Sequence, residues 1–271
     1  MSAYLTNINR RKIVKIQEIR EENSTIKTFT FHDKRCAEAK PGQFVMVWIP
    51  GVDEIPMSLS TISPDGLSSI TVAEVGEATK ALHQRKIDDV LGIRGPYGNG
   101  FTLTSGKVMI VGGGTGLTPL VPLVESLLKL PAKISFLIGA KTKDELFLLD
   151  RLGAAVQELT VATEDGSYGL KGLVTDPAEQ MLKRQRFDMI YACGPERMLL
   201  RMFLLAEQHD MSFQASFERY IRCGIGICGS CCIGEFRICK DGPVFSSRQL
   251  RKVKNEFGVF KREADGSKVA F

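Results

Sequence analysis

The sequence predicts a β-barrel plus α/β protein, with an antiparallel barrel first, a parallel-sheet α/β domain second and a small cysteine-rich module last. Three observations predict this order. Short β-type runs fill the first hundred residues, strand–turn–helix units repeat from residue 107, and five of the seven cysteines fall between Cys223 and Cys239. We place the boundaries so that the domains are 1–103, 104–219 and 220–271.

The first domain consists of short runs rich in β-branched and aromatic residues, separated by turn residues. Such spacing is typical of an antiparallel barrel or sandwich. One short helix is expected at 78–84, before the last run. The predicted strands are 13–19, 26–31, 44–49, 57–62, 70–75 and 90–94.

A different rhythm begins near residue 107, where strands and helices alternate. The first unit is an apolar strand, 108–111, a glycine-rich turn and a helix, 119–129. The strands are continuous apolar runs, as expected for a parallel sheet that is buried on both faces. The later strands are expected at 134–138, 159–162, 188–192 and 213–217, and the later helices at 143–152, 176–185 and 195–209.

The composition excludes several classes of protein. Hydrophobic residues make up 44% and charged residues 25%, which is typical of folded globular chains. No apolar run approaches the roughly 18 residues of a membrane-spanning helix, and the first ten residues are too polar for a secretory signal. We therefore expect a cytoplasmic protein with no membrane contact.

The net charge of +5 is mild, and it predicts no nucleic-acid partner. Basic residues gather after Ser246. We interpret this stretch as a solvated tail, with a docking surface for an acidic partner as the alternative.

Four cysteines, Cys223, Cys228, Cys231 and Cys239, have the spacing Cys-x4-Cys-x2-Cys-x7-Cys. The first three match the plant-type spacing of a [2Fe–2S] cluster. An odd number of cysteines argues against disulfides, and a zinc ribbon would need a second Cys-x2-Cys pair. We predict that these four residues hold a [2Fe–2S] cluster, with zinc as the rival and Cys232 as a spare ligand.

The glycine-rich turn 112–116 can place backbone N–H groups and a helix N-terminus against a pyrophosphate. It lacks the third glycine of the dinucleotide fingerprint, because residue 117 is Leu. Glu164 and Asp165, after a later strand, supply negative charge where a 2′-phosphate would require Arg or Lys. The sequence therefore favours NAD over NADP.

Three stretches together resemble the ferredoxin–NADP reductase superfamily, in which a β-barrel binds flavin and an α/β domain binds the pyridine nucleotide. They are Ile55-Pro56-Met57-Ser58, Gly112-Gly113-Gly114-Thr115-Gly116 and Cys193-Gly194-Pro195-Glu196-Arg197-Met198. With the cysteine motif and the stretch 239–245 appended, the chain resembles the electron transfer subunits of NAD-dependent dihydroorotate dehydrogenase. The resemblance extends from about residue 10 to about residue 245.

The resemblance implies specific cofactor contacts. FAD would contact Ile55, Pro56, Met57 and Ser58, lie along Val72, Ala73 and Glu74, and place its pyrophosphate at Ala78 and Thr79. NAD would lie on Gly112, Gly113, Gly114, Thr115, Gly116, Gly194 and Pro195, with Cys193 near the reactive nicotinamide carbon. Cys193 is equally consistent with a buried small residue that closes a strand. Ile55 stands where many relatives have an arginine that neutralises phosphate, and our hypothesis is that Arg94 or Lys80 compensates.

The implied function is electron transfer in pyrimidine (UMP) biosynthesis. NAD carries electrons as hydride and an iron–sulfur cluster carries them singly, so FAD belongs between them. The implied partner is an FMN-containing dihydroorotate dehydrogenase catalytic subunit, with two of each chain in a heterotetramer, and no dihydroorotate site is expected on this chain.

Two alternatives stay open at this point. One is a related flavin/iron-sulfur reductase subunit that links NAD(P)H to ferredoxin, hydrogenase or sulfur reduction. The other is a zinc-binding interaction protein whose basic tail contacts nucleic acid or an acidic protein.

Overall fold

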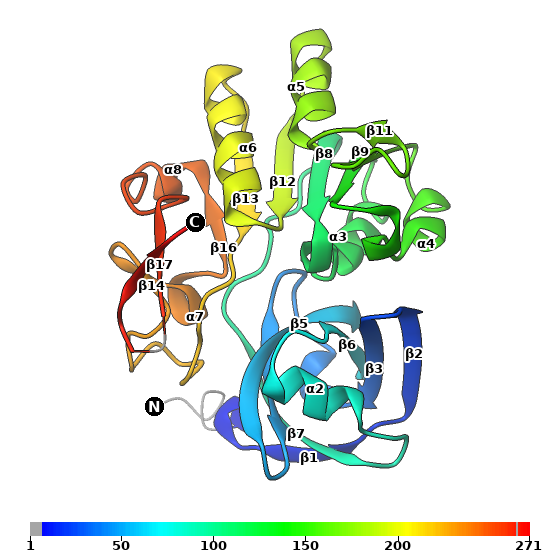
Figure 1. The fold of residues 1–271 in the computed structure, drawn as a ribbon, viewed down its shortest axis with the longest axis vertical. Helices are drawn as coiled ribbons and strands as arrows, with labels where there is room; N and C mark the ends of the chain where they lie inside the picture. Colours follow the sequence, from blue (N-terminus) through cyan, green and yellow to red (C-terminus); the bar gives the residue numbers. More distant parts are fainter. Residues whose placement is uncertain (1–6, 264) are drawn as a thin grey trace.

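The computed structural model describes residues 7–263 and 265–271. Two seven-stranded sheets form the body of the molecule, and a small C-terminal module packs beside them (Figure 1). The barrel occupies the lower half of Figure 1, the α/β domain the upper half, and the C-terminal module the left side. The predicted fold class is confirmed. Within the described ranges, no helix is both long and apolar enough to cross a membrane.

The barrel sheet is antiparallel throughout, with strand order β1-β7-β4-β5-β6-β3-β2. Its strands are β1 (Lys12–Lys15), β2 (Glu18–Asn23), β3 (Ile26–His32), β4 (Phe44–Ile49), β5 (Asp53–Ile62), β6 (Leu67–Ala73) and β7 (Val90–Tyr97), with helices η1 (Lys34–Cys36) and α2 (Glu77–His83). The prediction of one strand at 13–19 is wrong. The chain crosses there from β7 to β3, because Ile16 donates its N–H to Asp89 and Gln17 donates to Thr30.

Strand β4 is buried on both faces, and this places the barrel against the rest of the molecule. Val45, Val47 and Ile49 belong to the barrel core. Phe44 and Met46, which alternate with them, belong instead to the core shared with the C-terminal module. Phe44 and Met46 therefore join the barrel, which keeps a core of its own, to the core that contains the cysteine-rich module.

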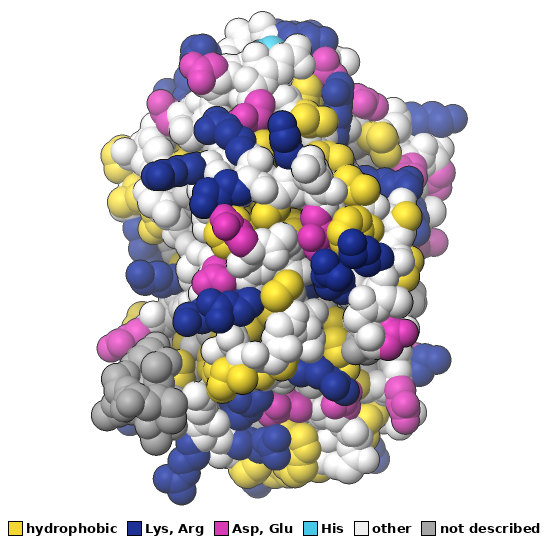
Figure 2. Space-filling view, turned by 90° about the vertical axis from the view of Figure 1, so that its left-hand side faces the viewer, with side chains coloured by type: hydrophobic (Ala, Val, Ile, Leu, Met, Phe, Trp, Pro, Cys, Tyr) yellow, Lys and Arg dark blue, Asp and Glu magenta, His cyan; other side chains and the backbone are white. Residues whose placement is uncertain are grey.

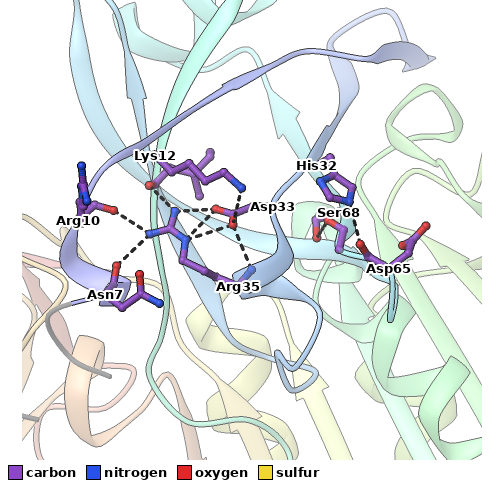
Figure 3. A network of polar contacts seen from close by, with 10 residues as sticks. Asn7, Arg10, Lys12, His32, Asp33, Arg35, Asp65 and Ser68 are labelled. Carbon is purple, nitrogen blue, oxygen red and sulfur yellow. Dashed lines mark hydrogen bonds and ion pairs between the residues drawn. The ribbon is translucent and has the colours of Figure 1, made fainter. Parts of the chain in front are cut away.

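Asp33 ties the N-terminal segment to the barrel (Figure 3). Its fully buried carboxylate accepts hydrogen bonds from Arg35 (Nη2 to Oδ2, 2.6 Å) and Lys12 (Nζ to Oδ1, 3.3 Å). Arg35 also donates to the carbonyl oxygens of Asn7 and Arg10. Burial raises the pKa of Asp33, but the hydrogen bonds and charge of Arg35 outweigh burial and leave the pKa below its ordinary value. The carboxylate therefore stays ionised inside the protein.

The second sheet has the order β11-β10-β9-β8-β12-β13-β16 and is parallel up to its last strand. Its strands are β8 (Gly106–Gly113), β9 (Ala132–Ala140), β10 (Glu158–Thr163), β11 (Leu170–Lys171), β12 (Met189–Cys193) and β13 (Phe213–Ser216). The helices are η2 (Gly114–Leu117), α3 (Leu120–Leu127), η3 (Lys143–Glu145), α4 (Leu149–Gly153), α5 (Thr175–Arg184) and α6 (Glu196–Gln208). The single helix predicted at 143–152 is wrong, because Leu148 has a φ of 61° and separates η3 from α4.

The C-terminal module contains β14 (Cys232–Ile233), β15 (Phe236–Arg237), α7 (Ile238–Asp241), β16 (Val244–Ser246), α8 (Ser247–Leu250), β17 (Phe260–Arg262) and β18 (Lys268–Ala270). β16 pairs antiparallel with β13, so the module contributes an edge strand to the α/β sheet. The prediction of a solvated tail is wrong. Leu250, Val253 and Phe257 are buried, and the Phe257 ring lies 5.8 Å from Phe203 of α6 and 5.0 Å from Phe217.

Candidate functional site

A cavity of about 350 Å³ lies where the barrel meets the α/β domain. One wall comes from β4, β5, β6 and α2, and the other comes from η2, from Thr118 directly after it and from the segment that follows β13. The cavity is lined by Phe44, Pro56, Met57, Ser58, Thr71, Val72, Ala73, Val75, Thr79, Thr115, Thr118, Phe217, Glu218, Arg219, Ile221 and Pro243. A mainly apolar cavity with a few polar groups at a domain junction suits a cofactor.

Many of the flavin-contact residues predicted from the sequence lie on this cavity. Pro56, Met57, Ser58, Val72, Ala73 and Thr79 line it, as does Thr115 of the glycine-rich turn. Ile55, Glu74 and Ala78 lie outside its walls: Ile55 and Ala78 pack against the barrel core, and Glu74 approaches His83 at 3.4 Å.

The sequence reasoning missed the segment from Phe217 to Ile221, which supplies a quarter of the lining residues. A signal for it was present. Glu218 and Arg219 are charged residues directly after a buried strand, at the carboxyl end of a parallel sheet, where ligands bind in α/β folds.

Two threonine hydroxyls on the cavity differ in what they can offer a ligand. The Thr79 hydroxyl is already used, since it accepts from the N–H groups of Val75 (2.9 Å) and Gly76 (2.8 Å) and donates to the Gly76 carbonyl. The buried Thr118 hydroxyl has no hydrogen-bond partner among the described residues. A buried hydroxyl without a partner is costly, so Thr118 fits a polar group of a bound nucleotide.

The glycine turn 112–116 and the turn after β12 pack closely against each other. A Cβ on Gly116 would lie 2.4 Å from the carbonyl oxygen of Cys193, and one on Gly194 would lie 2.9 Å from the nitrogen of Gly113. A Cβ on Gly114 would meet nothing within 4 Å. The turn therefore combines tight packing on one side with open space for a ligand on the other. Gly112 lies one residue before the end of β8 and pairs with Cys193, and Pro195 precedes α6.

Cys193 is buried at the end of β12 and interacts with Glu218, which lines the cavity. Burial raises the pKa of the Cys193 thiol, and the charge of Glu218 raises it further. The Glu218 side chain is open to solvent at the cavity, yet it lies deep among protein atoms, and this desolvation raises its pKa. The thiol of Cys193 is therefore held in its protonated form.

The four predicted cluster ligands form one loop system as two pairs of thiols. The thiol of Cys223 neighbours that of Cys228, and the thiol of Cys231 neighbours that of Cys239. Within residues 7–263 and 265–271, no three His, Cys, Asp or Glu side chains meet around a single-ion position. Two pairs fit two iron atoms with two thiolates each better than one tetrahedral zinc ion.

Backbone N–H groups surround these sulfurs. Gly226 donates to Cys239 Sγ at 3.2 Å, Ile227 donates to Cys223 Sγ at 3.4 Å, and Cys239 donates to Cys231 Sγ at 3.4 Å. Burial raises the pKa of Cys223, but the N–H groups of Cys228, Ile227 and Ile225 outweigh burial and bring the pKa to about 6. The hydrogen bond from Cys239 lowers the pKa of Cys231 to about 7, while the pKa of Cys239 itself is raised. The loop is preorganised to bind through thiolates.

Two aromatic side chains connect the cavity with the cysteine loop. Phe44 lines the cavity, and its ring centroid lies 5.9 Å from that of Tyr97. The Tyr97 ring lies directly against the loop, since a Cβ on Gly224 would be 3.1 Å from it. Gly224 has a φ of 74°, so the close approach and the backbone both require glycine.

Comparison with known proteins accounts for both sites. Residues 218–251 match the family model "Iron-sulfur cluster binding domain of dihydroorotate dehydrogenase B", and residues 110–202 match "Oxidoreductase NAD-binding domain". A protein of Methanocaldococcus jannaschii is 44% identical over 96% of this chain and 98% of its own length. A protein of Pyrococcus horikoshii is 44% identical over 93% of this chain and 96% of its own length. Both carry the name electron transfer subunit of dihydroorotate dehydrogenase B (NAD(+)).

The chain belongs to this family of electron transfer subunits. A solved chain described as "NADH-dependent reduced ferredoxin-NADP oxidoreductase" has a TM-score of 0.80, with 30% identity over 91% of this chain and 93% of its own length. The cytochrome b5 reductase domain of Ulva prolifera nitrate reductase, at 17% identity over 76% of this chain and 95% of its own length, shares the fold with a TM-score of 0.63.

Membership in the dihydroorotate dehydrogenase B family confirms the predicted cofactors, which are FAD, a [2Fe–2S] cluster and NAD. The iron–sulfur family model covers all four cysteines, and this decides against the zinc alternative. The shared name of the relatives implies a catalytic partner subunit.

Proposed function

We propose that this chain passes electrons between NAD and a dihydroorotate dehydrogenase catalytic subunit, with FAD in the junction cavity and a [2Fe–2S] cluster on Cys223, Cys228, Cys231 and Cys239. When bound, the cluster supplies one-electron transfer, and the flavin converts between single electrons and the hydride that NAD carries. Dihydroorotate oxidised on the partner loses two electrons, and NAD takes up both as hydride.

The observation that carries this proposal is the contact of Phe44 and Tyr97, which connects the cavity with the cysteine loop. Two redox groups so close can exchange electrons without any movement of the chain. The residues of this chain then bind and orient the cofactors and exclude water from them. This role needs no strong acid or base at the site.

We assign the flavin to the barrel wall of the cavity, along Pro56, Met57 and Ser58 and past Val72 and Ala73. The part of this wall that includes Thr79 would hold the adenine-nucleotide half. NAD approaches from the opposite wall, over Gly114 and Thr115. The unpartnered Thr118 hydroxyl and the open space beside Gly114 support this arrangement.

We place the partner over the exposed part of the cysteine loop. Ile227 is 77% exposed and Cys228 is exposed, so a second protein can approach the cluster closely at this point. Figure 2, which views the molecule from the side of the C-terminal module, shows many basic side chains on this face with acidic ones among them. A partner with a mainly acidic rim would suit it.

Our proposal includes an FMN-containing catalytic subunit and a complex with two copies of each chain. It also includes three units, 1–103 for FAD, 104–219 for NAD and 220–271 for the cluster. It also includes a cytoplasmic setting, which the odd number of cysteines supports.

The test is the visible spectrum, iron and acid-labile sulfide content of the anaerobically purified complex, compared between Cys228→Ser and Cys232→Ser. Cys232 is the matched control, because it adjoins Cys231 but lies outside the two thiol pairs. We expect two iron atoms per chain in the wild type and in Cys232→Ser, and loss of cluster with retention of FAD in Cys228→Ser. A colourless protein, or equal loss in both variants, would contradict the assignment.

A second candidate is a reductase subunit that links NAD(P)H to ferredoxin, and the TM-score of 0.80 to the ferredoxin-NADP oxidoreductase chain favours it. The two candidates differ in the partner. Dihydroorotate should reduce NAD through the purified complex in the first case, and only reduced ferredoxin should do so in the second.

A further inference from the structure

Arg94 is the one arginine of β7, and it does not line the flavin cavity. Its guanidinium, about 16% exposed, forms a bidentate ion pair with Glu54 of β5, with Nε to Oε1 at 2.9 Å and Nη2 to Oε2 at 2.6 Å. Lys80 is also absent from the walls of the cavity. Arg94 is therefore engaged elsewhere, and its contacts indicate a role other than neutralising the flavin phosphates.

The free edge of the Arg94 guanidinium faces the cysteine loop. Nη1 donates to the carbonyl oxygen of Cys223 at 3.4 Å and to the hydroxyl of Tyr97 at 3.1 Å. Next along the loop, Gly224 packs against the ring of Tyr97 and the side chain of Met46. Arg94 and Tyr97 thus hold the residue at the start of the loop from two sides.

Glu54 keeps Arg94 in this position. Besides the ion pair, Glu54 accepts from Arg11 (Nη2 to Oε1, 3.2 Å), and Arg11 lies over the Trp48 ring, 4.6 Å from its centroid. Burial raises the pKa of Glu54, but hydrogen bonds from Arg94 and Arg11 outweigh burial and lower it. Both members of the pair are therefore charged, and the fork geometry fixes the guanidinium.

We propose that Arg94 is a positioning residue for the cluster: it fastens the backbone of Cys223 to the flavin-binding barrel and places a cation beside the cluster. This inference rests on the proposed function, since it takes Cys223 as a cluster ligand. In this proposal the barrel both binds the flavin and, through Arg94, sets the reduction potential of the cluster.

The argument is electrostatic. Reduction adds one negative charge to a cluster, and a nearby cation stabilises that charge, whereas a nearby anion destabilises it. Arg94 contacts the ligand residue, and Glu54 lies behind Arg94 and partly cancels its charge. Removing the cation should lower the cluster potential, and removing only the anion should raise it.

The test uses Arg94→Gln, Arg94→Lys and Glu54→Gln in the cofactor-loaded full chain, with the midpoint potential of the cluster followed by electron paramagnetic resonance. We expect Arg94→Gln to shift the equilibrium against the reduced cluster about tenfold, which is ~59 mV for a one-electron couple. We expect Glu54→Gln to shift it in the opposite direction and Arg94→Lys to lie near the wild type. FAD content should stay at one per chain in all three.

Arg20→Gln is the matched control. Arg20 also pairs with a glutamate, Glu22, at 2.6 Å, but it lies on β2, on the side of the barrel away from the C-terminal module (Figure 1). Potentials and resonance signals of Arg94→Gln and Glu54→Gln that match this control would overturn the inference, as would shifts of the same sign in both. A wild-type chain without any cluster would overturn the proposed function as well, and its spectrum distinguishes that case.

Discussion

Truncation of Phe257 would test whether the C-terminal residues stabilise the cofactor cavity. The ring is fully buried and packs against Phe203 and Phe217, and Phe217 lines the cavity. Burial of a phenylalanine side chain is worth about 2–3 kcal/mol, and each aromatic pair adds about 0.5–1.5 kcal/mol. Phe257→Ala should therefore lower the free energy of unfolding by about 4 kcal/mol, in the range known for such truncations.

The assay is thermal unfolding of the FAD- and cluster-loaded chain, followed by circular dichroism and by the fluorescence of released flavin. At about 2–4 °C per kcal/mol, the midpoint should fall by about 10 °C, and flavin should be released at the same lower temperature. Val259→Ala is the control, because Val259 is 51% exposed and its truncation should change stability by less than about 0.5 kcal/mol. A midpoint for Phe257→Ala within about 2 °C of this control would refute the reasoning.

Three further predictions follow from single side chains. Thr118→Val removes a buried, unpartnered hydroxyl, so it should raise the stability of the cofactor-free chain by about 1 kcal/mol while weakening NAD binding several-fold in a titration. Asp33→Asn should destabilise the chain by about 3 kcal/mol at pH 7 in urea unfolding. Because the folded pKa of Asp33 is lowered, this difference is full above the ordinary value of 3.8 and disappears as pH falls through the folded pKa. Cys193, 2% exposed and with a raised pKa, should be alkylated by iodoacetamide at least about 100-fold more slowly than half-buried Cys232, as peptide mass spectrometry can measure.

Apolar runs, helical periodicity and cysteine spacing predicted individual strands, helices and the cysteine loop. The strand at 44–49 has the bounds predicted from its apolar run, and helix α6 differs from its prediction by one residue at each end. The cysteine spacing identified all four thiols that the structure brings together as pairs. These signals are local because the apolar run, the helical period and the cysteine spacing can each be recognised within a short stretch of the chain.

Long-range contacts explain what the sequence did not predict. Arg94 meets Glu54 only because β7 and β5 both pair with β4, and no local pattern indicates that ion pair. The C-terminal stretch was predicted to be a solvated tail because of its charged residues. Its Phe257 nevertheless packs between Phe203 and Phe217, which are distant in the sequence. Leu148 adopts a positive φ inside a helical pattern, which propensity alone does not predict.

The pairing of Ser216 with Val244 has a consequence for the speed of the internal electron transfer. The cysteine loop leaves the sheet at β13 and returns to it at β16, so both ends of the loop are fastened to adjacent strands of one rigid layer. A redox module on a flexible tether must swing toward its donor, and its rate then depends on solvent viscosity. Here the loop that would hold the cluster is anchored in a rigid sheet and packs against Tyr97 of the barrel, so adding glycerol should slow the encounters with NAD and with the partner but leave the step between the two internal centres unchanged.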